Sequence, residues 1–286
     1  MRLTETEITD EDVVLFNEVI KSLSGYDFTG YSIKSLKRRL NKILSDNTLN
    51  LKGLIDSIES DRNLLDKIVK TITVSTTELF RDPPIWLHIR KEVLPIYMNR
   101  EILRIWHPGS SSGQEVYSMM ILLSELHILD KSEIYASDIN SDLLEQAKEG
   151  KYKYRFNQIY LENFDLVLNH ESDLPGRNKK ISYEKYFTID KTHDFIQMKS
   201  FLTQKPLYRK IDLVRDENLF GKLFDIIICR NVVIYFNHEL QNKVLNLFYN
   251  NLTENGCLVL GLHESIIGPY SSHFDKKNIA YFKRKV

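Results

Sequence analysis

Residues 102–138 constrain this chain most, because they carry the pattern of a strand, a glycine turn, a helix and a second strand. The apolar run 102–106 leads into Gly109-Ser-Ser-Ser-Gly113, where two glycines permit a tight backbone path that a Cβ atom would block. Backbone N–H groups then line the start of the next helix. A second apolar run ends at Asp138. This alternation predicts a parallel sheet in an α/β fold.

The polar residues around this turn favour one class of ligand. A dinucleotide site would have the spacing G-x-G-x-x-G, whereas this turn reads G-x-x-x-G. Glu115 follows closely, and a carboxylate at a helix N-terminus suits a cationic ligand better than a phosphate. Asp138, at the end of a strand, can accept hydrogen bonds from ribose hydroxyls. The two features together predict an S-adenosylmethionine site, although each alone also occurs as an ordinary turn or helix cap.

A third cluster follows the apolar run 224–229, where Arg230, Asn231 and Tyr235 come directly after a predicted buried strand. Polar groups past the carboxyl end of a central strand lie where open α/β sheets bind ligands. The structural alternative is that Asn231 caps the next turn and Tyr235 packs on the sheet.

The remaining pattern divides the chain into two domains. Apolar residues recur at helical spacing from residue 1 to about 70, which predicts a helical domain. Residues 71–286 alternate further strands at 133–138, 207–212, 224–229, 257–261 and 279–285 with helices at 114–129, 141–149 and 238–252. The polar stretch at about 151–205 breaks this rhythm, so we interpret it as an inserted subdomain.

One helix of the N-terminal domain carries a basic face formed by Lys34, Lys37, Arg38 and Lys42. Such a face is either solvated surface or a docking stripe for an acidic helical partner. The sequence leaves both readings open.

Composition narrows the class of protein. The 39 basic residues balance 39 acidic ones, so nothing in the total charge indicates a nucleic-acid partner. Cys229 and Cys257 lie in apolar runs, and no apolar stretch is long enough to enter a membrane. We expect a cytoplasmic protein without membrane insertion and without a metal site.

Three segments carry a resemblance to a known family. Residues 73–82 read T-V-S-T-T-E-L-F-R-D, residues 106–118 read W-H-P-G-S-S-S-G-Q-E-V-Y-S, and residues 229–236 read C-R-N-V-V-I-Y-F. The last string reproduces the family pattern without a break, whereas Ser75 replaces an asparagine and Gln114 a glutamate. The chain therefore resembles the CheR-type chemoreceptor methyltransferases, which are S-adenosylmethionine-dependent protein-glutamate O-methyltransferases.

The resemblance implies a class I methyltransferase fold, that is, a Rossmann-like doubly wound sheet with a small inserted β-subdomain and an N-terminal all-helical domain for substrate docking. We assign the catalytic roles to Arg81 and Tyr235. The positions that would contact the cofactor, or its product S-adenosylhomocysteine, are Ser75, Thr77, Arg81, Gly109, Gly113, Glu115, Asp138, Asp212, Leu213, Arg230 and Asn231. The positions that would dock the receptor are Lys34, Lys37, Arg38, Arg39 and Lys42.

The expected reaction transfers a methyl group from S-adenosylmethionine to the γ-carboxylate of chemoreceptor glutamates for sensory adaptation. A glutamate side chain, with an ordinary pKa of about 4.3, is ionised at neutral pH, so the nucleophile needs no general base. Arg81 would orient the incoming carboxylate, and the Tyr235 hydroxyl would fix the approach of the methyl group. Two alternatives remain: a methyltransferase for a carboxylate of another signalling protein, and a non-catalytic signalling adaptor that keeps the fold.

Overall fold

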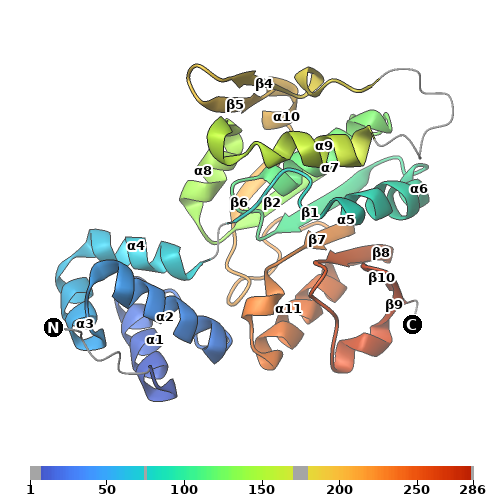
Figure 1. Cartoon of the computed structure of the whole chain (residues 1–286). Coiled ribbons are helices and arrows are strands. Elements are labelled where there is room, and N and C mark those ends of the chain that lie inside the picture. Colours follow the sequence, from blue (N-terminus) through green and yellow to red (C-terminus); the bar gives the residue numbers. More distant parts are fainter. Residues whose placement is uncertain (1–7, 74–75, 170–179, 285–286) are drawn as a thin grey trace. The chain divides into compact units, whose positions relative to one another are not determined.

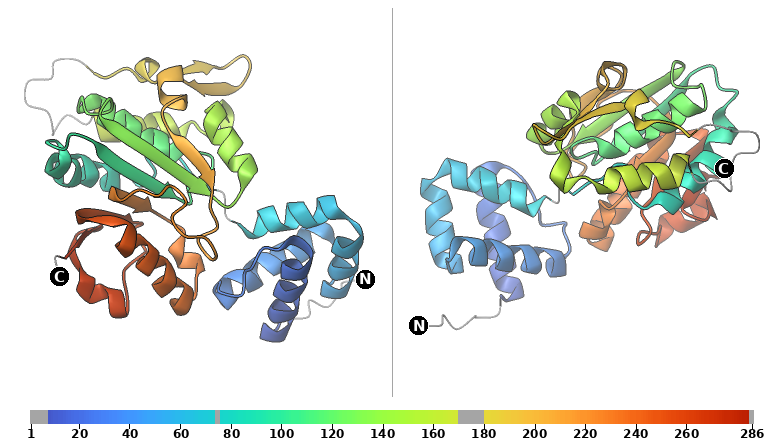
Figure 2. Two further views of the ribbon diagram at one scale, coloured as in Figure 1. Left: turned by 180° about the vertical axis from the view of Figure 1, so that it is seen from behind. Right: turned by 45° about the horizontal axis from the view of Figure 1, so that its top comes forward.

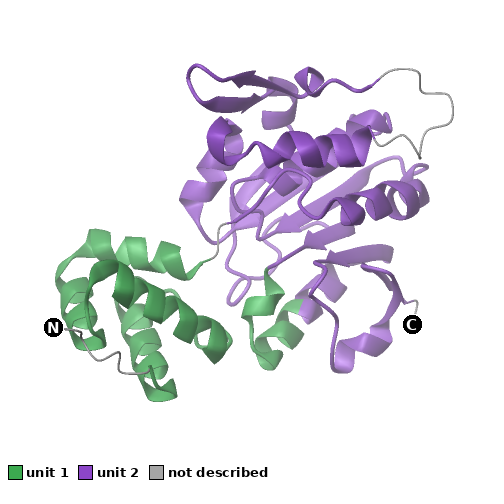
Figure 3. Ribbon diagram, in the orientation of Figure 1, with its two compact units in different colours: residues 1–74, 232–244 green, residues 75–231, 245–286 purple. Residues whose placement is uncertain are grey.

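The computed structural model describes residues 8–73, 76–169 and 180–284. The chain forms two compact units, coloured separately in Figure 3. One consists of residues 1–74 and 232–244, and the other of residues 75–231 and 245–286. The sequence pattern alone had grouped residues 232–244 with the strands and helices that follow residue 71. Each unit is described separately.

The N-terminal part of the first unit contains four helices, as the helical spacing predicts: α1 (Asp10–Ser24), α2 (Ile33–Asn47), α3 (Leu51–Ser60) and α4 (Arg62–Ile72). Side-chain caps mark the starts of α1, α3 and α4. Thr9 and Asp12 form a reciprocal capping box on α1, while Asn50 and Asp61 accept backbone N–H bonds at the starts of α3 and α4. The helices bury one apolar core, to which Phe16, Leu40, Leu54 and Ile68 contribute.

Residues 232–244 join this unit through backbone and ring contacts. They comprise a 3₁₀ turn, Val233–Tyr235, and the first half of α11 (His238–Asn251). The Ser32 N–H donates to the Tyr235 carbonyl at 2.8 Å, and the Asn237 N–H donates to the Gly30 carbonyl at 2.8 Å. The rings of Tyr31 and Phe236 meet edge to face at 5.1 Å. Two segments far apart in sequence are thus tied together.

The second unit is built on a seven-stranded sheet with the order β6-β2-β1-β7-β8-β10-β9 (Figure 1). The first five strands in this order run parallel, whereas β10 is antiparallel to both β8 and β9. The strands are β1 (Leu103–Pro108), β2 (Ser132–Asp138), β6 (Leu207–Lys210), β7 (Phe224–Cys229), β8 (Leu252–Leu260), β9 (Phe274–Lys277) and β10 (Ala280–Lys283). The chain leaves β1 for β2 on one side and later returns to β7 on the other, so a topological switch point lies between β1 and β7.

Side-chain alternation along the strands fills a separate core on each face of this sheet. Ile105, Ile134 and Ile226 contribute to a core shared with helices α5 (Pro83–His88), α7 (Gln114–Glu125) and α9 (Ile159–Leu168). On the opposite face, the Trp106 ring packs against those of Phe224 and Phe248 at centroid distances of 5.2 and 5.7 Å. Between α5 and β1 lie a π-helical turn (Ile89–Val93) and α6 (Leu94–Tyr97).

The predicted inserted subdomain contains a three-stranded antiparallel sheet with the order β3-β5-β4. Its strands are β3 (Lys151–Lys153), β4 (Phe187–Asp190) and β5 (Phe195–Met198), and two 3₁₀ turns (Tyr154–Phe156 and Tyr183–Lys185) and α10 (Ser200–Thr203) flank them. Figure 2 shows this small sheet outside the large one, on the side where α8 (Ser141–Glu149) and α9 lie. The expectation of a small β-subdomain is confirmed.

The structure differs from the sequence prediction at several element boundaries. Helix α7 ends at Glu125 rather than near residue 129, because His127 takes a left-handed φ of 57°. Strand β8 begins at Leu252 rather than at Cys257. Strand β9 was not predicted, because its exposed Asp-Lys-Lys sequence lacks an apolar alternation. Within residues 8–73, 76–169 and 180–284, the helices are too short or too polar to span a bilayer.

Candidate functional site

The glycine turn between β1 and α7 needs left-handed backbone at three of its five residues. Gly109, Ser111 and Gly113 have φ values of 72°, 51° and 92°. A Cβ atom on Gly113 would lie 2.8 Å from the Cβ of Ala147 in α8, so this position requires glycine both for its φ and for the close approach. The Ser112 carbonyl accepts a hydrogen bond from the Tyr152 hydroxyl at 2.6 Å.

Asp138, at the end of β2, is tied to this turn by its carboxylate. One carboxylate oxygen accepts the Ser111 N–H at 2.8 Å, and the other accepts the Asn140 N–H at 2.9 Å. The side chain is buried, which raises the pKa of its carboxyl group, and the backbone N–H bonds partly oppose that rise. Backbone donors therefore determine the position of this acid.

The end of β6 places Asp212 and Leu213 beside the end of β2. Asp138 pairs with Lys210 in the sheet register, and the Ile211 N–H donates to the Asp138 carbonyl at 3.1 Å. Leu213 is buried, while the half-buried Asp212 accepts the N–H of Val214 at 2.9 Å. Asp138 thus ends a parallel strand, and Gly109, Asp212 and Arg230 follow parallel strands, all at one edge of the sheet.

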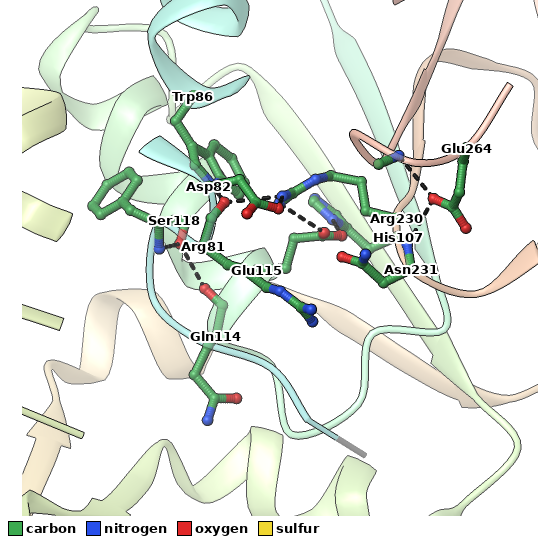
Figure 4. A network of polar contacts seen from close by, with 12 residues as sticks. Arg81, Asp82, Trp86, His107, Gln114, Glu115, Ser118, Arg230, Asn231 and Glu264 are labelled. Carbon is green, nitrogen blue, oxygen red and sulfur yellow. Dashed lines mark hydrogen bonds and ion pairs between the residues drawn. The ribbon is translucent and has the colours of Figure 1, made fainter. Parts of the chain in front are cut away.

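Glu115, in the first turn of α7, belongs to a network of charged side chains (Figure 4). One of its oxygens lies 3.1 Å from His107 Nδ1, and the other lies 3.5 Å from an Arg230 nitrogen. The buried Arg230 guanidinium has a closer partner in Asp82, at 2.7 Å, and it also donates to the Arg81 carbonyl at 2.9 Å. Two carboxylates and one guanidinium make this cluster net negative when the His107 ring is neutral.

Arg81 lies on a strained loop that connects to this network through its backbone. Its neighbours Phe80 and Asp82 have φ values of 52° and 57°. The Phe80 N–H donates to Ser118 Oγ at 2.7 Å, and the Arg81 carbonyl accepts from Trp86 Nε1 at 2.9 Å. The Arg81 guanidinium is half-buried and points away from that of Arg230 in Figure 4. Its Nη1 donates to the Thr76 carbonyl at 3.2 Å.

Asn231 also has left-handed backbone, with a φ of 59°, and Glu264 holds it there. The buried Glu264 carboxylate accepts the N–H groups of Asn231 and Gly261, each at 2.7 Å. Glu264 was not among the predicted site residues. The available signal was an acidic residue three positions after the predicted strand 257–261, where a turn needs a hydrogen-bond acceptor.

Gln114 does not extend the charged network. Its amide oxygen accepts from Ser112 Oγ at 2.8 Å, and its amide nitrogen donates to the Tyr160 hydroxyl at 2.7 Å. The side chain is buried, and both ends of the amide have partners. A neutral amide therefore suits this position in the chain.

The structure also places the remaining predicted site residues. Thr77 is half-buried and lies outside helices and strands, whereas Ser75 lies outside the described residues. Asp82, Trp86 and His107 belong to the network, although the sequence analysis did not select them. For Asp82, the available signal was its place next to the predicted site residue Arg81. For His107, it was a polar residue directly after an apolar run.

The basic face of α2 is less uniform than the sequence predicts. Lys34, Arg38 and Lys42 are exposed, whereas Lys37 is partly covered and forms an ion pair with Asp10 at 2.6 Å. Arg39 turns inward: its guanidinium lies 5.0 Å from the centroid of the Tyr235 ring and donates to the Thr71 carbonyl at 3.1 Å. Burial lowers the pKa of Arg39. Arg39 therefore does not belong to the exposed face, because its charge packs on an aromatic ring.

The site fits S-adenosylmethionine on its own chemistry. The net negative cluster around Glu115 suits a sulfonium and an ammonium group, and Asp138 offers carboxylate oxygens for ribose hydroxyls. Ser110 Oγ and His107 Nε2 are buried polar atoms that have no hydrogen-bond partner among the described residues. Among all the residues that the structure describes, no group of three or more His, Cys, Asp or Glu side chains could hold a metal ion.

Comparison with known proteins gives matches along most of the chain. The family model described as "CheR methyltransferase, SAM binding domain" matches residues 75–164 and 170–282, and that described as "CheR methyltransferase, all-alpha domain" matches residues 11–73. The protein Cher3 of Pseudomonas putida is 34% identical, over 96% of each chain. A chemotaxis protein methyltransferase of Vibrio anguillarum is 30% identical, over 93% of each chain.

One solved structure shows a distant likeness in fold. SAM-bound CalS10, an amino pentose methyltransferase from Micromonospora echinaspora, is 13% identical, with 61% of this chain and 50% of that chain covered at a TM-score of 0.33. From the two family models and the relatives, we conclude that this chain belongs to the CheR methyltransferase family and contains its S-adenosylmethionine-binding domain.

Proposed function

We propose that this protein transfers a methyl group from S-adenosylmethionine to the γ-carboxylate of glutamates in chemoreceptors, giving methyl esters for sensory adaptation. The observation that carries the proposal is that Glu115 and Asp138 lie on either side of one glycine turn, in a chain of this family. Relatives named chemotaxis protein methyltransferase, from Vibrio anguillarum and Listeria innocua, support the chemotaxis assignment. The reaction would take place on the cytoplasmic helices of the receptor.

Each carboxylate would recognise a different part of the cofactor. Asp138 would accept hydrogen bonds from ribose hydroxyls, and Glu115 would bind the ammonium group of the methionine part. Leu213, which is buried, would contact the adenine, and Asp212 would accept from its amino group. Gly109 and Gly113 would let the backbone approach the ligand closely.

Bound S-adenosylmethionine supplies an electrophilic methyl group on a sulfonium. The receptor carboxylate arrives ionised, so the protein must mainly hold the reacting atoms in line, an effect worth roughly 7–11 kcal/mol in favourable intramolecular systems. We assign Arg81 to orient the carboxylate by a charge-assisted hydrogen bond and Tyr235 to fix the approach with its hydroxyl. Neither side chain acts as a general base.

We assign receptor docking to the exposed cations of α2. Lys34, Arg38 and Lys42 face solvent and would attract acidic receptor helices, whereas Arg39 packs on Tyr235 and would support that ring instead. Charge reversal at Lys34 and Arg38 should therefore raise KM for the receptor more than it lowers kcat.

The test is transfer of a radiolabelled methyl group to a purified receptor cytoplasmic fragment, scored as alkali-labile ester. Arg81→Ala should remove most turnover, and Tyr235→Phe should lower turnover while S-adenosylmethionine still binds by calorimetry. Arg284→Ala, an exposed arginine paired with Asp275, serves as the matched control. Full activity in both site variants contradicts the catalytic assignment. Binding of the cofactor without transfer to any receptor glutamate would favour another acceptor protein, and absence of binding would favour an adaptor.

A further inference from the structure

His107 is a fully buried imidazole near the end of β1, directly beneath the glycine turn. Its Nδ1 lies 3.1 Å from a carboxylate oxygen of Glu115, whose side chain is 13% exposed. The His107 ring is fully buried whereas the Glu115 side chain is partly exposed, so a ligand can reach the carboxylate from the solvent side.

The contact with His107 is the shorter of the two that hold Glu115. Arg230 approaches the other Glu115 oxygen only to 3.5 Å, because its guanidinium already pairs with Asp82 at 2.7 Å and with the Arg81 carbonyl at 2.9 Å. A 3.5 Å separation is at the limit of hydrogen bonding. His107 is therefore the side chain that best fixes the rotamer of Glu115.

The chemistry of the contact determines which atom carries the hydrogen. An ionised carboxylate offers only acceptors, so His107 Nδ1 must donate. A neutral ring can make this bond without adding a positive charge. Glu115 then keeps its full negative charge for a ligand, which a lysine or arginine in the same place would neutralise.

We infer that His107 is a positioning residue that orients Glu115 toward the ammonium group of the ligand. It thereby sets the preference for S-adenosyl compounds with an amino-acid part over thioether nucleosides without one. The inference rests on the proposed assignment of Glu115 to that ammonium group. It assigns to one buried histidine the discrimination between two ligands that share the same nucleoside.

The experiment measures the dissociation constants of S-adenosylhomocysteine and 5′-methylthioadenosine by calorimetry for the full-length protein. His107→Ala should weaken S-adenosylhomocysteine binding about tenfold and change 5′-methylthioadenosine binding less than twofold, because only the former carries the ammonium group. His107→Asn places an amide N–H near the position of Nδ1 and should restore affinity to within about threefold. His88→Ala, which removes a partly buried imidazole whose Nε2 atom is buried, is the matched control.

The outcomes separate this inference from the proposed function. Equal weakening of both ligands in His107→Ala, no weakening of either, or failure of His107→Asn to restore affinity overturns the positioning role. If Glu115→Gln weakens only S-adenosylhomocysteine binding and His107→Ala does not, the inference alone is overturned and the proposed function stands. If the unaltered protein binds neither ligand, the proposed function fails, and the inference fails with it.

Discussion

Glu115 and Asp138 lie on either side of the same glycine turn, but different kinds of groups hold them. Backbone N–H groups of Ser111 and Asn140 bind Asp138, so any sequence that forms this turn would hold that acid. Side chains of His107 and Arg230 hold Glu115, so its position depends on residue identities elsewhere in the chain. The comparison teaches that one end of the proposed cofactor site is determined by backbone geometry and the other by side-chain chemistry.

The largest expected effect comes from removal of the backbone-held acid. Asp138→Ala should weaken S-adenosylmethionine binding at least about a hundredfold, because both the ribose acceptor and the acceptor for the Ser111 N–H are lost. Isothermal titration calorimetry measures this change, with Glu149→Ala, exposed on α8, as the control. Retention of wild-type affinity would remove Asp138 from the site.

A change in the turn that lies between both acids should lower the unfolding free energy of the protein. Gly113→Ala forces a left-handed residue to carry a Cβ atom 2.8 Å from that of Ala147, and we expect a loss of about 2 kcal/mol in unfolding free energy. Gly221→Ala separates strain from clash, because Gly221 has a φ of 63° but no atom within 4 Å of the added Cβ. Equal losses in urea denaturation would show that the close approach to Ala147 contributes nothing.

Neutralising the side-chain-held acid should have a smaller and more selective effect. Glu115→Gln should weaken S-adenosylmethionine binding about tenfold, or about 1.4 kcal/mol, and leave 5′-methylthioadenosine almost unchanged. Glu133→Gln removes a carboxylate that pairs with Arg104 on β1 and is the matched control. A uniform loss for both ligands would assign Glu115 to the structure of the turn rather than to the ammonium group.

The smallest expected effect is a pH dependence of the protein without ligand. Burial raises the pKa of Asp138, so the folded state takes up a proton at a higher pH than the unfolded chain. The contribution of Asp138 to unfolding free energy should therefore rise as pH falls through its raised pKa, and should be lost again as pH rises. Asp138→Asn removes this pH-dependent contribution to the unfolding free energy. A stability difference between the two proteins that is constant from pH 7 to 4 would contradict it.

Much of this site could be predicted from sequence, because its positions follow strand ends. Apolar runs at 102–106, 133–138 and 224–229 predicted parallel strands, so Asp138 and Arg230 were expected at one edge of a sheet. The part that could not be predicted depends on side-chain direction. The pattern gave no reason for His107 to meet Glu115, or for Asp82 rather than Glu115 to be the closest partner of Arg230.

The same limit applies to the basic helix. Arg39 has the charge of a docking residue, and only the three-dimensional contact with Tyr235 reveals that it faces inward. Helical spacing accounts for the buried Leu36 and Leu40 of α2, although Ile33 is exposed, and it could not identify an aromatic partner so far along the chain. Likewise, the polar edge strand β9 carries no apolar alternation from which it could be recognised.

The backbone hydrogen bonds that join residues 30–32 to residues 235–237 also determine when, during synthesis, the first unit can be completed. The N-terminal helices leave the ribosome long before the segment that completes their unit. At about 5–20 residues per second, the intervening chain takes on the order of ten to forty seconds to synthesise. During that interval Tyr31 lacks the Phe236 ring that it contacts in the finished protein. The first unit to emerge is thus among the last to be completed.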